Sequence, residues 1–153
     1  MSYFAAVVAR TNGRWSAREL DLARAETIDD LTELVRDTTA EASVSVLFIE
    51  QDDEYVGIVR LDAEIDDPRV FLSNSGAGAE YPLAGILADV LVEEDDEMDG
   101  EPVGDLDLVG DLGTPARDLI ALIEHEGILP ADVINTVCER AGCLDALEGL
   151  RGA

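Results

Sequence analysis

An Asn-Gly pair at positions 12 and 13 constrains the beginning of this fold more than any other local signal. Residues 3–9 form a nearly unbroken apolar run before the pair, and residues 15–22 follow it. Asn and Gly both tolerate the positive φ angles that a tight hairpin turn requires. Two antiparallel strands joined by a short turn are therefore predicted at the start of the chain.

The remaining segments extend this sheet and add helices. Strands are predicted at residues 44–49, 55–61 and 69–72, and the first two are joined by the polar turn Gln51-Asp52-Asp53-Glu54. Apolar residues with helical spacing follow Thr27, Pro82, Pro115, Pro130 and Cys143. Thr27-x-x-Asp30 resembles a capping box, and Thr114-Pro115 is typical of a cap followed by a first-turn proline.

The predicted fold class is α+β. We expect a mainly antiparallel five-stranded sheet in the order β-β-α-β-β-β-α, with helices on one face, followed by a C-terminal helical segment. Residues 1–92 are assigned to the α+β domain, 93–111 to an acidic linker or loop, and 112–153 to the helical segment. Two arrangements stay open: the helical segment either packs with residues 1–92 as one domain or stands apart.

Negative charge is concentrated in the middle of the chain. The protein has 35 acidic residues against 10 basic ones, every basic residue is Arg, and the net charge is -25. Residues 70–116 hold no cationic side chain. Such a surface repels phosphate and attracts basic protein faces, so direct capture of nucleic acid is excluded. Solubility or adaptation to high salt explains the charge equally well. The candidate partner-docking residues are Glu93, Glu94, Asp95, Asp96, Glu97, Asp99 and Glu101.

Two short motifs point towards ligands but lack a required residue. Gly76-Ala77-Gly78 stands between a predicted strand and a helix, as a dinucleotide fingerprint does, but Tyr81 occupies the third glycine position. Asp95-x-Glu97-x-Asp99-Gly100 has the spacing of a calcium loop, but Leu106 stands where the bidentate Glu belongs. No cofactor and no metal site are predicted.

The soft-ligand side chains do not form a recognisable catalytic pattern. His125 is the single histidine, and Cys138 and Cys143 are separated by four residues, which is not a zinc-knuckle spacing. Gly-x-Ser-x-Gly is absent from the sequence. We therefore expect a protein without enzymatic activity. Reduced thiols and the lack of a 20-residue apolar run favour a cytoplasmic location without a membrane span.

Six distinctive strings are spread along nearly the whole chain: Met1 to Arg10, Gly13-Arg14-Trp15, Asp67 to Ser73, Gly110 to Gly113, Leu129 to Val133 and Val137 to Cys143. Together they resemble the tRNA adenosine deaminase-associated protein family of high-G+C bacteria. The family name implies a link to the deaminase. The deaminase itself binds zinc through His-x-Glu and Pro-Cys-x-x-Cys, a pattern that His125 and the two cysteines do not match.

Three functional hypotheses follow. The first is a non-enzymatic accessory protein that binds another protein, with the tRNA adenosine deaminase as the partner that the resemblance implies. The second is an acidic nucleic-acid mimic that titrates a different basic protein. The third is a small enzyme or metal-binding protein that uses His125 or the acidic cluster.

Overall fold

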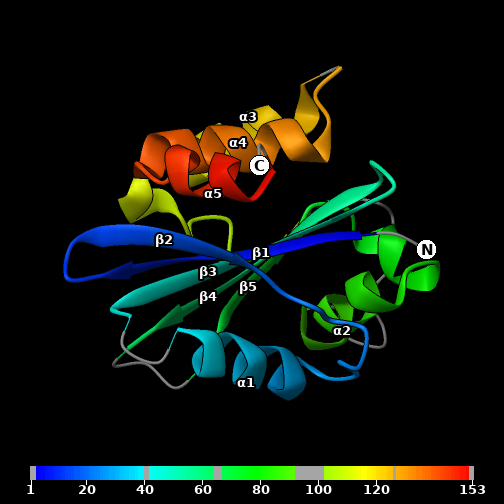
Figure 1. Cartoon of the computed structure of the whole chain (residues 1–153). Helices are drawn as coiled ribbons and strands as arrows, with labels where there is room; N and C mark the ends of the chain where they lie inside the picture. The colour runs from blue at the N-terminus through cyan, green and yellow to red at the C-terminus, as the bar shows by residue number, and fades with distance from the viewer. Residues whose placement is uncertain (1–2, 40–41, 64–66, 92–101, 126, 152–153) are drawn as a thin grey trace.

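An antiparallel sheet runs through the middle of the computed structural model (Figure 1). The structure describes residues 3–39, 42–63, 67–91, 102–125 and 127–151. Neighbouring strands follow the order β2-β1-β3-β4-β5-β6. The strands are β1 (Tyr3–Thr11), β2 (Arg14–Glu19), β3 (Val44–Gln51), β4 (Tyr55–Asp62), β5 (Arg69–Leu72) and β6 (Val103–Gly104).

The two predicted hairpin turns have positive φ angles at their central residues. Asn12 and Gly13 adopt φ angles of 54° and 79° between β1 and β2. Asp52 and Asp53 adopt φ angles of 52° and 57° between β3 and β4. Positive φ is easy for Gly and tolerable for Asn and Asp, which is why these residue types can close the turns.

Two helices cover one face of the sheet (Figure 1). They are α1 (Ile28–Thr38) and α2 (Pro82–Leu91), and the 3-10 helix η1 (Ser75–Ala79) precedes α2. The predicted capping box is present: the Thr27 side chain accepts a hydrogen bond from the Asp30 N–H, and Asp30 accepts one from the Thr27 N–H. These bonds satisfy N–H groups that the first turn of a helix leaves without partners.

The opposite face is covered by the C-terminal helices (Figure 1). These are α3 (Ala116–Glu124), α4 (Pro130–Ala141) and α5 (Leu144–Arg151), preceded by the short 3-10 helix η2 (Gly110–Leu112). α4 ends at Gly142, whose φ of 90° suits a residue without a side chain. α4 contacts β3 and β4, and α5 contacts β2, so the helical segment packs directly on the sheet.

Each face of the sheet therefore has its own apolar core. On β3, Leu47 faces the core beneath α1 and α2, whereas Phe48 faces the core beneath the C-terminal helices. Both side chains are fully buried. Burial of a side chain of this size contributes about 1.5–3 kcal/mol. A strand that is buried on both faces explains why residues 46–49 are all apolar, without alternation.

The predicted α+β class is confirmed, and two details differ. The sheet has six strands rather than five, because Val103 pairs with Leu72 and Gly104 pairs with Phe71. Helices cover both faces, because the C-terminal segment occupies the face opposite α1 and α2. Of the expected acidic linker 93–111, residues 102–111 are described, and Leu108 and Val109 there are fully buried.

Candidate functional site

The seven carboxylates that the sequence nominates for partner docking lie outside the described residues. The same holds for the calcium-like motif that overlaps them. The structure does describe the elements on either side: α2 ends at Leu91, and β6 begins at Val103. β6 is the edge strand next to β5, so the acidic run leads into one edge of the sheet.

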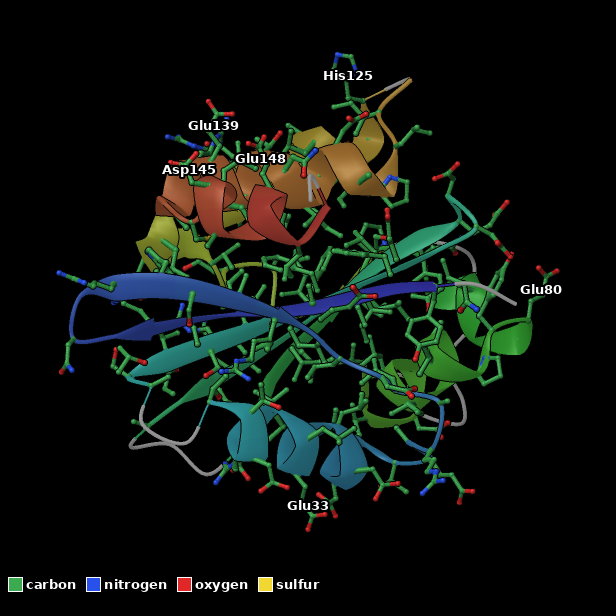
Figure 2. All side chains as sticks on the ribbon, viewed as in Figure 1. Glu33, Glu80, His125, Glu139, Asp145 and Glu148 are labelled. Carbon is green, nitrogen blue, oxygen red and sulfur yellow. The ribbon has the colours of Figure 1, made fainter. Side chains whose placement is uncertain are left out.

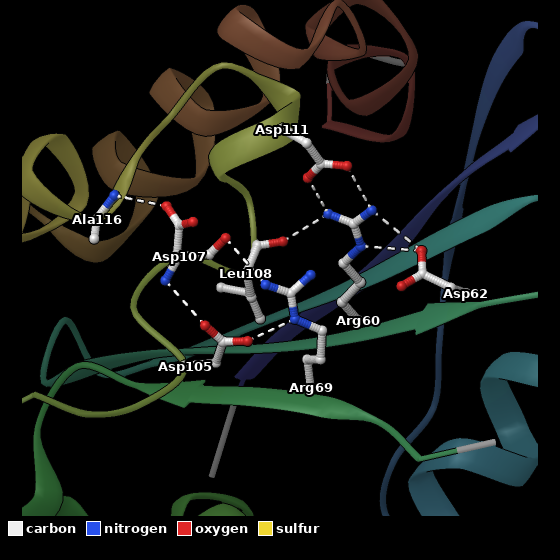
Figure 3. A network of polar contacts seen from close by, with 8 residues as sticks. All are labelled: Arg60, Asp62, Arg69, Asp105, Asp107, Leu108, Asp111 and Ala116. Carbon is white, nitrogen blue, oxygen red and sulfur yellow. Dashed lines mark hydrogen bonds and ion pairs between the residues drawn. The ribbon is translucent and has the colours of Figure 1, made fainter. Parts of the chain in front are cut away.

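Arg60 on β4 joins the sheet to the segment that follows this run (Figure 3). Its side chain is 6% exposed. Nη1 donates to the Leu108 carbonyl at 2.7 Å and to Asp111 Oδ1, and Nη2 donates to Asp111 Oδ2 at 2.9 Å. Nε donates to Asp62 Oδ1 at 3.1 Å. All three guanidinium nitrogens are thus hydrogen-bonded, which a buried charge requires.

Arg69 on β5 makes a second set of contacts beside the first (Figure 3). It lies directly opposite Arg60 in the register of β4 and β5. Like charges at such a position repel each other. Asp105 offsets the repulsion by accepting from Arg69 Nε, and the Asp107 carbonyl accepts from Arg69 Nη2 at 3.1 Å. Two arginines on neighbouring strands thereby hold residues 105–111 against the sheet.

The ion pairs change the proton affinities of their carboxylates. A hydrogen bond from Arg60 lowers the pKa of Asp111 below its ordinary value. A hydrogen bond from Arg69 lowers the pKa of Asp105 in the same way. The bond from Asp111 raises the pKa of Arg60. An ionised form held by a hydrogen-bonded opposite charge is favoured, so these groups stay charged at neutral pH.

Asp107 caps α3, a role that the sequence assigned to Thr114. Asp107 Oδ1 accepts from the Ala116 N–H at 3.1 Å, and the Asp107 N–H donates to Asp105 Oδ1 at 3.1 Å. Thr114 is fully buried, and its hydroxyl has no hydrogen-bond partner among the described residues. The prediction was wrong because folding brings the carboxylate of Asp107, nine residues before Ala116, to the first turn of α3.

The arrangement of these charges is structural rather than chemical. Two carboxylates and a carbonyl accept hydrogen bonds from the Arg60 guanidinium, and the Asp107 side chain accepts one from the first turn of α3. Nothing in this network is placed to activate a nucleophile among the described side chains. The network instead holds residues 105–111, which follow the acidic run, against the sheet.

Other carboxylates are spread over the outer surface (Figure 2). Glu33 extends from α1 on one side of the molecule, and Glu80 extends from the end of η1. Glu139 on α4, with Asp145 and Glu148 on α5, extends from the opposite side. All five are exposed. Acidic charge in the described part of the chain therefore surrounds the protein rather than forming one row.

The two cysteines lie together where α4 ends. Cys138 and Cys143 are free thiols and are fully buried in the core beneath the C-terminal helices. The Cys143 N–H donates to the Cys138 carbonyl at 2.9 Å across Gly142. A hydrogen bond from the Cys138 side chain lowers the pKa of the Cys143 thiol. His125 extends outward at the end of α3 and is exposed (Figure 2), whereas both thiols are buried.

Metal ligation finds no support in the described ranges. Within them, no three His, Cys, Asp or Glu side chains are grouped so that they could hold an ion. Gly76 and Gly78 belong to η1, where a Cβ on Gly78 would lie 3.1 Å from that of Ala88. This glycine thus allows η1 to approach α2 closely, a packing role. Every helix in the described ranges is too short or too polar to cross a bilayer.

Two hollows beside α1 include polar side chains that form hydrogen bonds with the nearby backbone. One, of about 450 Å³, includes Asp21 and Asp30, which accept hydrogen bonds from nearby backbone N–H groups. The other, of about 360 Å³, includes Thr38 and Thr39. Their hydroxyls donate to the carbonyls of Leu34 and Val35 at 2.8 and 2.7 Å. Asp30, Thr38 and Thr39 therefore satisfy backbone groups at or near the two ends of α1, and Asp21 does so in the segment before it.

Comparison with known proteins gives the family. A family model described as Rv3753c-like tRNA adenosine deaminase-associated protein matches residues 3–144. The chain belongs to this family. The match covers the sheet, α1 to α4 and the start of α5, and it confirms the resemblance found in the sequence. No curated protein and no solved structure matches the chain.

Proposed function

We propose that this protein is a non-enzymatic, cytoplasmic accessory protein that binds the tRNA adenosine deaminase. The observation that carries the proposal is membership of a family whose name associates it with that enzyme. The charge supports it: an enzyme that grips tRNA presents Arg and Lys to phosphates, and a protein of net charge -25 is complementary to such a surface.

The nominated carboxylates from Glu93 to Glu101 contribute by attracting the partner. Charges at an interface chiefly raise the rate of encounter and set orientation. Arg60 and Arg69 anchor the chain that follows these carboxylates, so the acidic run is tethered to one edge of the sheet. The proposed role of the run is therefore electrostatic steering towards the deaminase.

Nucleic-acid mimicry receives less support from the described residues. A mimic needs carboxylates in a fixed row on ordered elements. The labelled acids extend from different sides of the molecule (Figure 2), and Asp105, Asp107 and Asp111 are engaged in internal contacts. Diffuse negative charge around a stable fold favours contact with one basic protein over imitation of a duplex.

Co-purification tests the proposal. The tagged chain is incubated with purified tRNA adenosine deaminase from the same organism at low and at moderate salt, and both are recovered on the tag. Retention of the deaminase at low salt with a smaller yield at moderate salt is the expected result. Lack of retention at both salt concentrations would contradict the proposal.

A further inference from the structure

A groove of about 260 Å³ opens between the β3–β4 turn and the connection of α3 to α4. Three separate parts of the chain line it: the β3–β4 turn, the segment after β5 and the connection of α3 to α4. Its charged members are Asp53 and Glu54. Its apolar members on the side of the C-terminal helices are Ile123, Ile128, Pro130 and Val133. A site with both apolar surface and carboxylates suits a ligand that is apolar and cationic at once.

The acidic side of the groove is held in place by hydrogen bonds. The Glu54 N–H donates to the Gln51 carbonyl at 3.0 Å, and the Asn74 amide donates to the Glu54 carbonyl at 3.4 Å. Ser73 Oγ accepts from the Val56 N–H at 2.8 Å. Contacts of this kind fix the backbone of the turn before any partner arrives. A preorganised surface loses less entropy on binding.

The backbone conformation of the turn determines where its carboxylates lie. Asp52 and Asp53 both have positive φ, whereas the equivalent turn between β1 and β2 uses Asn12 and Gly13. Asp tolerates the left-handed conformation better than most residues other than Gly, so both aspartates fit this turn. Of these two residues, Asp53 lines the groove, so this turn places its carboxylate there.

An exposed leucine adjoins the apolar side. Leu129 is 47% exposed, although it is flanked in the chain by the lining residues Ile128 and Pro130. Its N–H donates to Asp132 Oδ2 at 3.1 Å, so its backbone is fixed at the start of α4. Leu129 therefore adds exposed apolar surface next to the apolar lining residues of the groove.

We propose that this groove, with Leu129 beside it, docks a segment of the tRNA adenosine deaminase that bears an apolar side chain and a neighbouring Arg or Lys. This rests on the proposed function. The apolar side chain contacts Ile123, Ile128 and Leu129, while the cation contacts Asp53 and Glu54. Charge complementarity favours the deaminase as the partner, because a tRNA-binding enzyme has basic segments and the groove has carboxylates.

Calorimetric titration with the purified deaminase tests this assignment on the full-length chain. The two groove variants are Leu129→Ser and the pair Asp53→Asn with Glu54→Gln. Each matches a control elsewhere: Val90→Ser, because Val90 is 49% exposed on α2, and Asp145→Asn with Glu148→Gln on α5. Asn is favoured at positive φ, so the turn variant keeps its fold. We expect each groove variant to weaken binding about tenfold and each control to change it less than about twofold.

Three outcomes would overturn the assignment. Equal affinities for the wild type and all variants would exclude the groove and leave the proposed function standing. Equal losses in the groove and control charge variants would indicate diffuse attraction rather than docking. If the wild type alone sediments as a larger species than the groove variants do, with no deaminase present, the occupant of the groove is a second copy of this chain. Absence of binding by the wild type would contradict the proposed function itself.

Discussion

At the scale of single residues, Arg60 connects the sheet to the chain beyond the acidic run. A charge that is 6% exposed is costly to bury, and it is tolerated here because Asp62, Asp111 and the Leu108 carbonyl surround it. The sequence gives no local sign of this contact, because Asp111 lies 51 residues after Arg60. Composition predicts only that a rare cation will find acidic partners.

Replacing Asp111 with Asn should destabilise the fold, because the bidentate ion pair is lost while Arg60 stays buried. The expected loss in the free energy of unfolding is about 1–2 kcal/mol, less than for a fully buried pair because Asp111 is 61% exposed. Urea unfolding measures it. Asp89→Asn, an exposed change on α2, is the matched control and should alter stability by less than about 0.5 kcal/mol. Equal stabilities of the two variants would contradict this role for Asp111.

The same pair predicts a dependence on pH. The pKa of Asp111 is lower in the folded state than the ordinary value of about 3.9. Its contribution is therefore complete above that value and is lost as the pH falls through the folded pKa. Wild type should exceed Asp111→Asn by a constant margin between pH 7 and pH 5, and the margin should shrink below about pH 4. A margin that grows in acid would refute this assignment.

At the scale of elements, β6 shows what local sequence signals miss. The Asn12-Gly13 turn and the Thr27 capping box were predictable because each depends on residues adjacent in the chain. β6 has two residues and no periodicity, and it forms only because Val103 and Gly104 meet β5, about thirty residues earlier. The cap of α3 by Asp107 has the same origin. Elements that depend on distant contacts cannot be inferred from local patterns.

Two glycine substitutions should have opposite effects. Gly104 has a φ of 106°, and a Cβ there would overlap the Val70 carbonyl oxygen, so Gly104→Ala should displace β6 and cost about 1–3 kcal/mol. Gly149 lies within α5 with open space around it, so Gly149→Ala should stabilise by about 0.5–1 kcal/mol. Thermal unfolding of both variants gives the signs, and a stabilising Gly104→Ala would contradict the role of β6.

At the scale of the whole molecule, the fold separates apolar packing from charge. Two cores occupy the two faces of one sheet, and carboxylates extend from the outer surfaces of the helices on both sides (Figure 2). The sequence predicted the class of fold and the excess of negative charge. It did not predict the groove beside Leu129, because the groove combines residues from the β3–β4 turn, the β5–η1 segment and the α3–α4 connection.

Calorimetric titration of the tRNA adenosine deaminase with the wild-type chain, repeated from about 50 to about 200 mM salt, tests the proposed function most directly. Binding by an acidic accessory protein predicts measurable heat at low salt. It also predicts an association constant that falls steadily as the salt concentration rises. Absence of binding at every salt concentration, or an association constant that does not change with salt, would contradict the proposed function.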